Sequence, residues 1–79
     1  MLTHRDRILM LLKKNPDRWF FAKEIRQRLR VPMFCISPVL KRLRTRNRVF
    51  YRYPNISEKR VNLGLGDLWM YQHKGETDA

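Results

Sequence analysis

The sequence predicts a small α+β domain that is mainly helical, with three helices and a small antiparallel β-hairpin. Three observations predict this class. The chain has 79 residues, which is enough for one domain and too few for two. Apolar residues recur at helical spacing in three successive segments before residue 47. Residues 49–53 and 68–71 are short and rich in aromatic residues, as in paired strands. We assign residues 1–74 to this domain and expect residues 75–79 to form a disordered tail.

A first helix is expected from Thr3 to about Lys14. Thr3 is a favourable N-cap, and Asp6, three residues later, nearly completes a capping box and suits the positive end of the helix dipole. The segment 15–17, Asn-Pro-Asp, ends this helix because the residue before a proline is pushed out of the α region. The aromatic run at 19–21 is too short for an independent strand but could pair at the edge of a small sheet.

A second helix is expected from Ala22 to Arg30, with Ile25 and Leu29 facing inward and Glu24 able to pair with Arg28. A third helix is expected next; it is rich in basic residues and ends near Arg46. Its apolar positions lie within about 80° of one helix face; they are Met33, Ile36, Leu40 and Leu43. The opposite face is polar and positively charged, so this helix is suited to lie against a polyanion.

Pro38 lies inside the third helical segment and leaves two structures possible for this segment. A proline in the middle of a helix costs about 3 kcal/mol, because it lacks an N–H and clashes with the preceding turn. Ser37 and Pro38 are also a favourable N-cap and first helical residue. Either residues 33–36 form a separate turn and the regular helix begins at Ser37, or one helix is kinked at Pro38. We favour the first, which would turn a helix N-terminus outward as a phosphate site.

The last part of the chain predicts the two strands of the hairpin. Asn47 is well placed as the left-handed residue after the third helix. Residues 49–53 form the first expected strand and residues 68–71 the returning strand, with turns at 54–55 and 64–66. The aromatic side chains are expected mainly in the core, although they could instead form a base-stacking platform; they are Trp19, Phe20, Phe50, Trp69 and Tyr71. Tyr51 and Tyr53 are expected to be exposed.

The net charge is the unusual part of the composition. Eighteen Lys and Arg against seven Asp and Glu give a formal charge of +11, and arginine outnumbers lysine two to one. The charges are clustered, which favours a polyanionic partner over a surface that is merely basic. The single cysteine, Cys35, cannot form an internal disulfide, and no apolar run is long enough to span a membrane. We expect a cytoplasmic protein, associated with the nucleoid or, if viral, located in the host-cell cytoplasm.

Enzyme chemistry finds little support in the sequence, and we expect no catalytic activity. The carboxylates are dispersed, and His4 and His73 lie at opposite ends of the chain, so no metal site is expected. The glycines at 64 and 66 lack the rest of a phosphate-binding loop, and no cofactor or small-molecule ligand is expected. Cys35 is expected to be a small buried apolar residue rather than a redox switch.

Two short motifs carry a family resemblance. Ala22, Glu24, Ile25, Leu29 and Val31 match an A-x-E-I-x-x-x-L-x-V pattern, and Ile36, Ser37, Leu40 and Leu43 match V-S-x-x-L-x-x-L. With these motifs, residues 5–53 resemble the winged helix-turn-helix domain of bacterial, archaeal and viral transcription regulators. Two positions depart from the family pattern. Arg30 stands where the turn usually has glycine, and Pro38 stands where a polar residue is common.

The resemblance implies a double-stranded DNA-binding protein, specifically a transcriptional regulator. The third helix would enter the major groove and the wing would touch the backbone or the minor groove. The candidates for base contact are Phe34, with a thymine methyl as its partner, Ser37, Lys41 and Arg42. The candidates for phosphate contact are Lys23, Arg26, Arg44, Arg46 and Arg48, and the wing candidates are Arg52, Lys59 and Arg60, which bracket the loop after the first strand.

Two other functions remain open at the level of sequence. The chain could be a non-specific DNA- or RNA-binding accessory protein, or a winged-helix protein-interaction module that binds an acidic partner. A homodimer is also expected, because Met10 and Leu11 add apolar surface to a first helix whose inner stripe is already sufficient.

Overall fold

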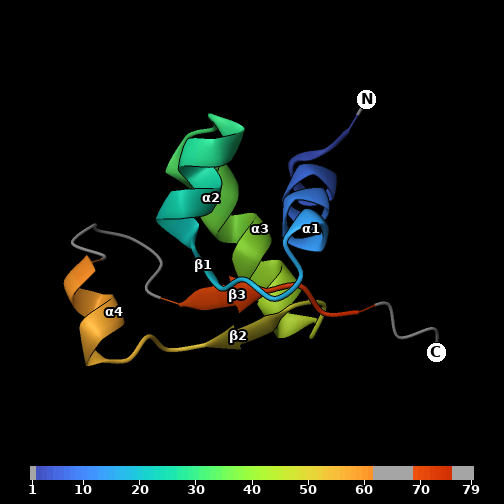
Figure 1. Cartoon of the computed structure of the whole chain (residues 1–79). Coiled ribbons are helices and arrows are strands. Elements are labelled where there is room, and N and C mark those ends of the chain that lie inside the picture. The colour runs from blue at the N-terminus through green and yellow to red at the C-terminus, as the bar shows by residue number, and fades with distance from the viewer. Residues whose placement is uncertain (1, 62–68, 76–79) are drawn as a thin grey trace.

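The computed structural model describes residues 2–61 and 69–75. Within these residues the elements follow the order α1 (His4–Lys14), β1 (Phe20–Phe21), α2 (Ala22–Leu29), α3 (Met33–Thr45), β2 (Phe50–Arg52), α4 (Ile56–Val61) and β3 (Met70–Gln72). Helices α1, α2 and α3 lie together over one face of a three-stranded antiparallel sheet (Figure 1). The mainly helical α+β class is confirmed. The expected three helices are joined by a fourth, α4, which was missed. The two expected strands are joined by β1, which pairs at the edge of the sheet as the aromatic run at 19–21 allowed.

Helix α1 begins and ends where its capping residues predict. The N–H of Asp6 donates to Oγ1 of Thr3 at 3.1 Å, and the N–H of Thr3 donates to Oδ2 of Asp6 at 3.2 Å, which completes the capping box. At the other end Asn15 caps the helix, and its side-chain amide donates to the carbonyl of Leu11. These two hydrogen bonds satisfy two of the backbone N–H groups at the start of α1 that have no partner within the helix.

The turn between α2 and α3 is held by α1. Arg30, at φ 55°, takes the left-handed conformation after α2, and the N–H of Val31 donates to the carbonyl of Arg26. The guanidinium of Arg7 donates to the carbonyl of Leu29 at 2.8 Å, so α1 satisfies a terminal carbonyl of α2. This side-chain bond helps the chain accept a left-handed arginine in place of glycine.

Helix α3 runs without interruption from Met33 to Thr45 and contains Pro38. The favoured start at Ser37 was therefore wrong, and no outward helix N-terminus exists there. Residues 33–36 form the first turn of α3, which places Ile36 on the buried stripe, and the N–H of Cys35 donates to the carbonyl of Pro32 in this turn. Pro38 and Phe34 are both exposed, one turn apart, so the Phe34 carbonyl that loses its donor faces water.

The end of α3 sets the direction of β2. Asn47 has φ 58°, the left-handed conformation expected from its position. The N–H of Arg48 donates to the carbonyl of Leu43 at 2.9 Å, and the N–H of Asn47 donates to that of Arg44 at 3.0 Å. This pair of bonds is a Schellman motif, which reverses the chain within two residues of the helix end.

Strand β3 lies in the centre of the sheet, in the order β1-β3-β2. The returning strand is confirmed at Met70 and Tyr71, whereas Leu68 lies outside the described residues. Tyr71 pairs with Phe20 on one side and Tyr51 on the other, and Met70 pairs with Phe21 and Arg52. Because paired residues share a face of the sheet, Phe20, Tyr71 and Tyr51 lie on one face and their chain neighbours on the other. Phe20 and Tyr71 belong to the hydrophobic core, and Phe21 and Met70 on the other face are also buried.

The aromatic residues divide between core and surface. Phe20 and Tyr71 are fully buried, as expected. Phe50 is 47% exposed, so its expected place in the core was wrong; it stands near the edge, on strand β2. Tyr51 and Tyr53 are exposed, as predicted, and the Tyr53 ring stacks on Trp69 with 3.8 Å between ring centroids.

The core lies between the helices and the sheet. Its buried members are Ile8, Leu12, Phe20, Ala22, Ile25, Val31, Ile36, Leu40, Leu43, Val49 and Tyr71. Cys35 is half-buried and packs against it. Met10 is exposed, but Leu11 also packs against this core, so the prediction that both side chains lie outside the core was wrong for Leu11. Among the described residues, no helix has the length and apolar character needed to cross a membrane.

Replacing Pro38 by alanine is expected to stabilise the fold. The Pro38 side chain is exposed, so its removal costs little packing. Alanine supplies the missing N–H and removes the clash of the proline ring with the preceding turn. After subtraction of the entropy that proline removes from the unfolded chain, the free energy of unfolding should rise by about 1–3 kcal/mol.

The measurement is urea denaturation followed by circular dichroism. Lys41→Ala, on the same exposed face, is the control and should change stability by less than about 0.5 kcal/mol. A Pro38→Ala variant that is less stable than the wild type would contradict this account of α3.

Candidate nucleic-acid interface

Residues 25–57 contain no Asp or Glu but nine basic residues. They are Arg26, Arg28, Arg30, Lys41, Arg42, Arg44, Arg46, Arg48 and Arg52. The two carboxylates that bound this segment are both held by arginines. Glu24 lies 2.7 Å from Arg18, in place of the expected Arg28, and Glu58 lies 2.8 Å from Arg52. Helix α3 and strand β2 therefore lie in a part of the chain that creates a strongly positive electrostatic potential.

Helix α3 presents one exposed row of side chains, here called the α3 ridge. Phe34, Pro38, Lys41 and Thr45 follow one another at spacings of four, three and four residues, and all four are exposed. The opposite face of the helix is buried at Ile36, Leu40 and Leu43, which confirms the expected apolar stripe.

Lys41 and Arg42 are the exposed cations at the centre of this surface. Both lie on α3 and point away from its buried stripe. Neither forms an ion pair with another residue in the described parts of the chain. Ser37, the third polar candidate, is half-buried. The two charged candidates are thus available to a partner, whereas the hydroxyl is less so.

Arg44 is brought onto the sheet instead of facing outward. Its Nη1 donates to the hydroxyl of Tyr71 at 2.8 Å, and its guanidinium lies 4.9 Å from the ring centroid of Trp69. The expected phosphate contact is therefore also a link between α3 and strand β3. Its charge remains part of the local field, but its donors serve the packing of the two elements.

The turn after α3 gathers further positive charge. Arg46 and Arg48 are exposed there, as a phosphate contact requires. Lys74 joins them from the other end of the described chain, because its ammonium donates to the carbonyl of Asn47 at 3.0 Å and lies near the ring of Phe50. Sequence reasoning missed Lys74, since nothing local signals a contact between residues 27 positions apart.

The remaining phosphate candidates lie on α2. Lys23 and Arg26 are both half-buried. Arg28, for which sequence predicted a pairing with Glu24, instead places its guanidinium over Phe20, 5.6 Å from the ring centroid. These residues flank the buried side of α2 and do not belong to the α3 ridge.

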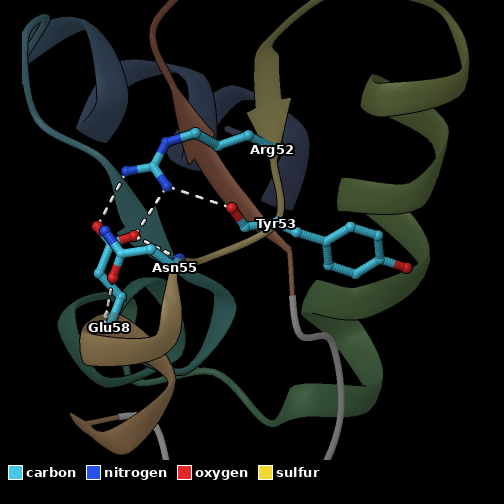
Figure 2. Close-up of polar contacts among 4 residues, drawn as sticks. All are labelled: Arg52, Tyr53, Asn55 and Glu58. Carbon is cyan, nitrogen blue, oxygen red and sulfur yellow. Dashed lines mark hydrogen bonds and ion pairs between the residues drawn. The ribbon is translucent and has the colours of Figure 1, made fainter.

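Arg52 joins β2 to α4 through a two-pronged ion pair (Figure 2). Its Nη1 and Nη2 donate to the two carboxylate oxygens of Glu58 at 2.8 and 2.9 Å, and Nη1 also donates to the carbonyl of Tyr53. The guanidinium lies 4.6 Å from the ring centroid of Trp19. This expected wing contact therefore has its donors directed at the protein, and we call the Arg52–Glu58 pair the wing clamp.

Helix α4 was missed in the sequence, which was interpreted as a loop. The signal was present at Asn55 and Glu58, which have capping-box spacing. Oδ1 of Asn55 accepts from the N–H of Glu58 at 2.8 Å, and a Glu58 oxygen accepts from the N–H of Asn55 at 2.9 Å. Lys59 and Arg60 consequently belong to α4 and do not bracket a loop, so that expectation was wrong.

The wing clamp lowers the pKa of Glu58 to about 2. Hydrogen bonds from Arg52 are the main cause, and the backbone N–H of Asn55 adds to them. The same pair raises the pKa of Arg52. Glu58 is thus ionised at any pH near neutrality, and it cancels one positive charge of the wing.

The described residues hold no group of three or more His, Cys, Asp or Glu side chains arranged to bind a metal ion. The exposed side chains of this surface offer hydrogen-bond donation by Lys and Arg, together with the apolar contact of Phe34. Hydrogen-bond donors and exposed apolar groups are the kinds of side chain that contact the acceptors and methyl groups of base edges.

Acid titration should reveal the wing clamp directly. The pKa of Glu58 is about 2 in the folded protein and 4.5 for the free side chain. Its contribution to stability is therefore complete above pH 4.5 and is lost as the pH falls through 4.5 toward 2. Carboxyl carbon chemical shifts measured by NMR should give this low value, and Arg52→Gln should return it most of the way to 4.5.

Asp6 provides the internal control. Its pKa is lowered by its own hydrogen bonds to Thr3, at the other end of the chain, and should not move in Arg52→Gln. An unchanged Glu58 titration in Arg52→Gln would show that the ion pair does not form in solution.

Comparisons with protein-family models, with curated proteins and with solved structures found no match to this chain. The motifs of residues 22–43 and the geometry of α3 are therefore the grounds on which a function can be proposed.

Proposed function

We propose that this protein is a winged helix-turn-helix domain that binds double-stranded DNA and regulates transcription. The observation that carries the proposal is the α3 ridge, which includes the exposed Lys41 and has the exposed Arg42 beside it, while the opposite face of the helix is buried. A helix fixed by one face and positively charged on the other can enter the major groove without disturbing the core. Such a role would place the protein in the cytoplasm with the nucleoid, or in a host cell if it is viral.

The arrangement of the elements supports this proposal. Helices α2 and α3 are joined by a short turn through left-handed Arg30, and β2 follows α3 closely and pairs with β3, which comes after α4. In a helix-turn-helix domain the second helix of the motif carries the base contacts and the first crosses the backbone. Helix α3 would therefore be the reading helix and β2–β3 the wing.

The individual residues take different roles in the complex. Lys41 and Arg42 would contact base edges, where guanine O6 and N7 are the commonest acceptors. Arg46, Arg48 and Lys74 would bind phosphates and fix the register. Arg44 and Arg52 would act mainly by holding α3 and α4 against the sheet.

Selection of bound duplexes from a random pool, at a salt concentration of about 0.15 M, tests the proposal. The wild type should enrich one motif. In Lys41→Ala/Arg42→Ala, discrimination at one or two positions of that motif should fall by about 5- to 150-fold, the value of a good base contact. Arg46→Ala should weaken binding to all sequences and reduce the log–log salt slope by about 0.9.

Lys13→Ala/Lys14→Ala is the matched control, because it removes the same charge from the exposed end of α1. Uniform weakening of all sequences by the Lys41/Arg42 change would instead favour non-specific binding of DNA or RNA. If neither duplex nor RNA binds, the chain is better described as a protein-interaction module.

The homodimer remains a prediction based on Met10. This side chain is 45% exposed on α1, while Leu11 packs against the core. Sedimentation velocity should detect a dimer that Met10→Glu weakens, because a charge cannot be buried without a partner. A monomer at all accessible concentrations would contradict it.

A further inference from the structure

The α3 ridge changes character along its length. From Val31 to Leu40 the chain contains no Asp, Glu, Lys or Arg, and Ser37 has the only hydroxyl in this stretch. The first half of the ridge consists of the Phe34 and Pro38 rings, and the second half begins at Lys41. A surface that is apolar at one end and cationic at the other requires a partner with both kinds of group.

Phe34 is the largest anomaly on this surface. It is 77% exposed, more than any other large apolar residue that the structure describes. Burying such a side chain would stabilise the fold, yet the fold leaves it in water. Seven and eight residues further along, Lys41 and Arg42 give the same face a positive charge. Charge complementarity therefore selects a polyanion as the partner that covers Phe34.

We propose that Phe34 and Pro38 recognise the C5-methyl groups of thymine in the major groove. This inference rests on the proposed function and specifies how its site selects sequence. The thymine methyl is the apolar group that base edges offer in the major groove. Guanine, adenine and cytosine edges instead present donors and acceptors, which would lose their water beneath a phenyl ring and gain no partner.

The spacing of the two rings limits the number of bases involved. Phe34 and Pro38 are four residues apart, a rise of about 6 Å along the helix axis. Successive base pairs rise about 3.4 Å along DNA, so the two rings cover about two neighbouring base pairs. Lys41 then reaches the next part of the groove. The expected target contains adjacent thymines beside a base with acceptors for Lys41 or Arg42.

Two synthetic duplexes test the proposal without knowledge of the natural site. One pairs a strand with runs of adjacent dT against complementary dA, and the other has dU in place of every dT, so that only the C5-methyl groups differ. Burial of one methyl group changes affinity by about fourfold, and two change it by about 15-fold. Fluorescence anisotropy should show that the wild type prefers the dT duplex by about 15-fold, and Phe34→Ala should reduce this to the roughly fourfold preference of the single contact left at Pro38.

Two control variants separate the methyl contact from general effects. Ile56→Ala removes an equally exposed apolar side chain from α4, 74% exposed, and should keep the preference for dT. Lys41→Ala should weaken both duplexes by the same factor and leave their ratio unchanged. Circular dichroism should be the same for Phe34→Ala and the wild type, since the ring has little core contact.

The outcomes distinguish this inference from the proposed function. Equal affinity of the wild type for the two duplexes overturns the methyl contact and leaves DNA binding intact. Absence of binding to both overturns both proposals. A preference for dT that is undiminished in Phe34→Ala overturns the assignment to this ring. A Phe34→Ala variant whose only change is a lower sedimentation coefficient also overturns it, because that would identify a contact between two copies of the chain.

Discussion

Burial of one face of α3 is the constraint on which the rest of the structure depends. Ile36, Leu40 and Leu43 fill the space between α1, α2 and the sheet, and none of them is more than 3% exposed. A chain of this size buries a modest core, and these three residues are its fully enclosed members on α3. Once these three are fixed, the helical period sends Lys41 and Arg42 outward with no freedom to turn away. The orientation of the charged surface is therefore a consequence of packing.

Arginines in this protein serve two physical purposes that the net charge does not separate. Arg7, Arg44 and Arg52 each donate to a fixed acceptor within the chain: a helix-terminal carbonyl, a buried tyrosine hydroxyl and a carboxylate. They allow a small core to be extended by cationic side chains whose aliphatic parts pack against it. Arg42, Arg46 and Arg48 remain exposed and keep the long-range field.

The parts of the fold that local sequence controls could be predicted. The Thr3–Asp6 capping box, the left-handed Asn47 and the buried stripe of α3 depend on neighbours within five residues. The effect of Pro38 was misjudged because the helix continues through it, with Ile36 before it and Leu40 after it on one buried stripe. Helix α4 was missed although Asn55 and Glu58 had the spacing of a cap. Arg44, Lys74 and Leu11 depend on contacts with distant segments, which the sequence does not reveal.

The central position of β3 has a consequence for the order in which the protein folds. Strands β1 and β2 do not pair with each other, and both pair with β3, about 50 residues after the first and 20 after the second. During synthesis the three main helices can collapse early through local contacts, but no strand has a partner until residues 70–72 leave the ribosome. Until then the edges of β1 and β2 are unpaired, and Tyr71 is missing from the core. Until β3 emerges, the nascent chain exposes strand edges that can pair with other chains, and its many positive charges would limit aggregation during that interval.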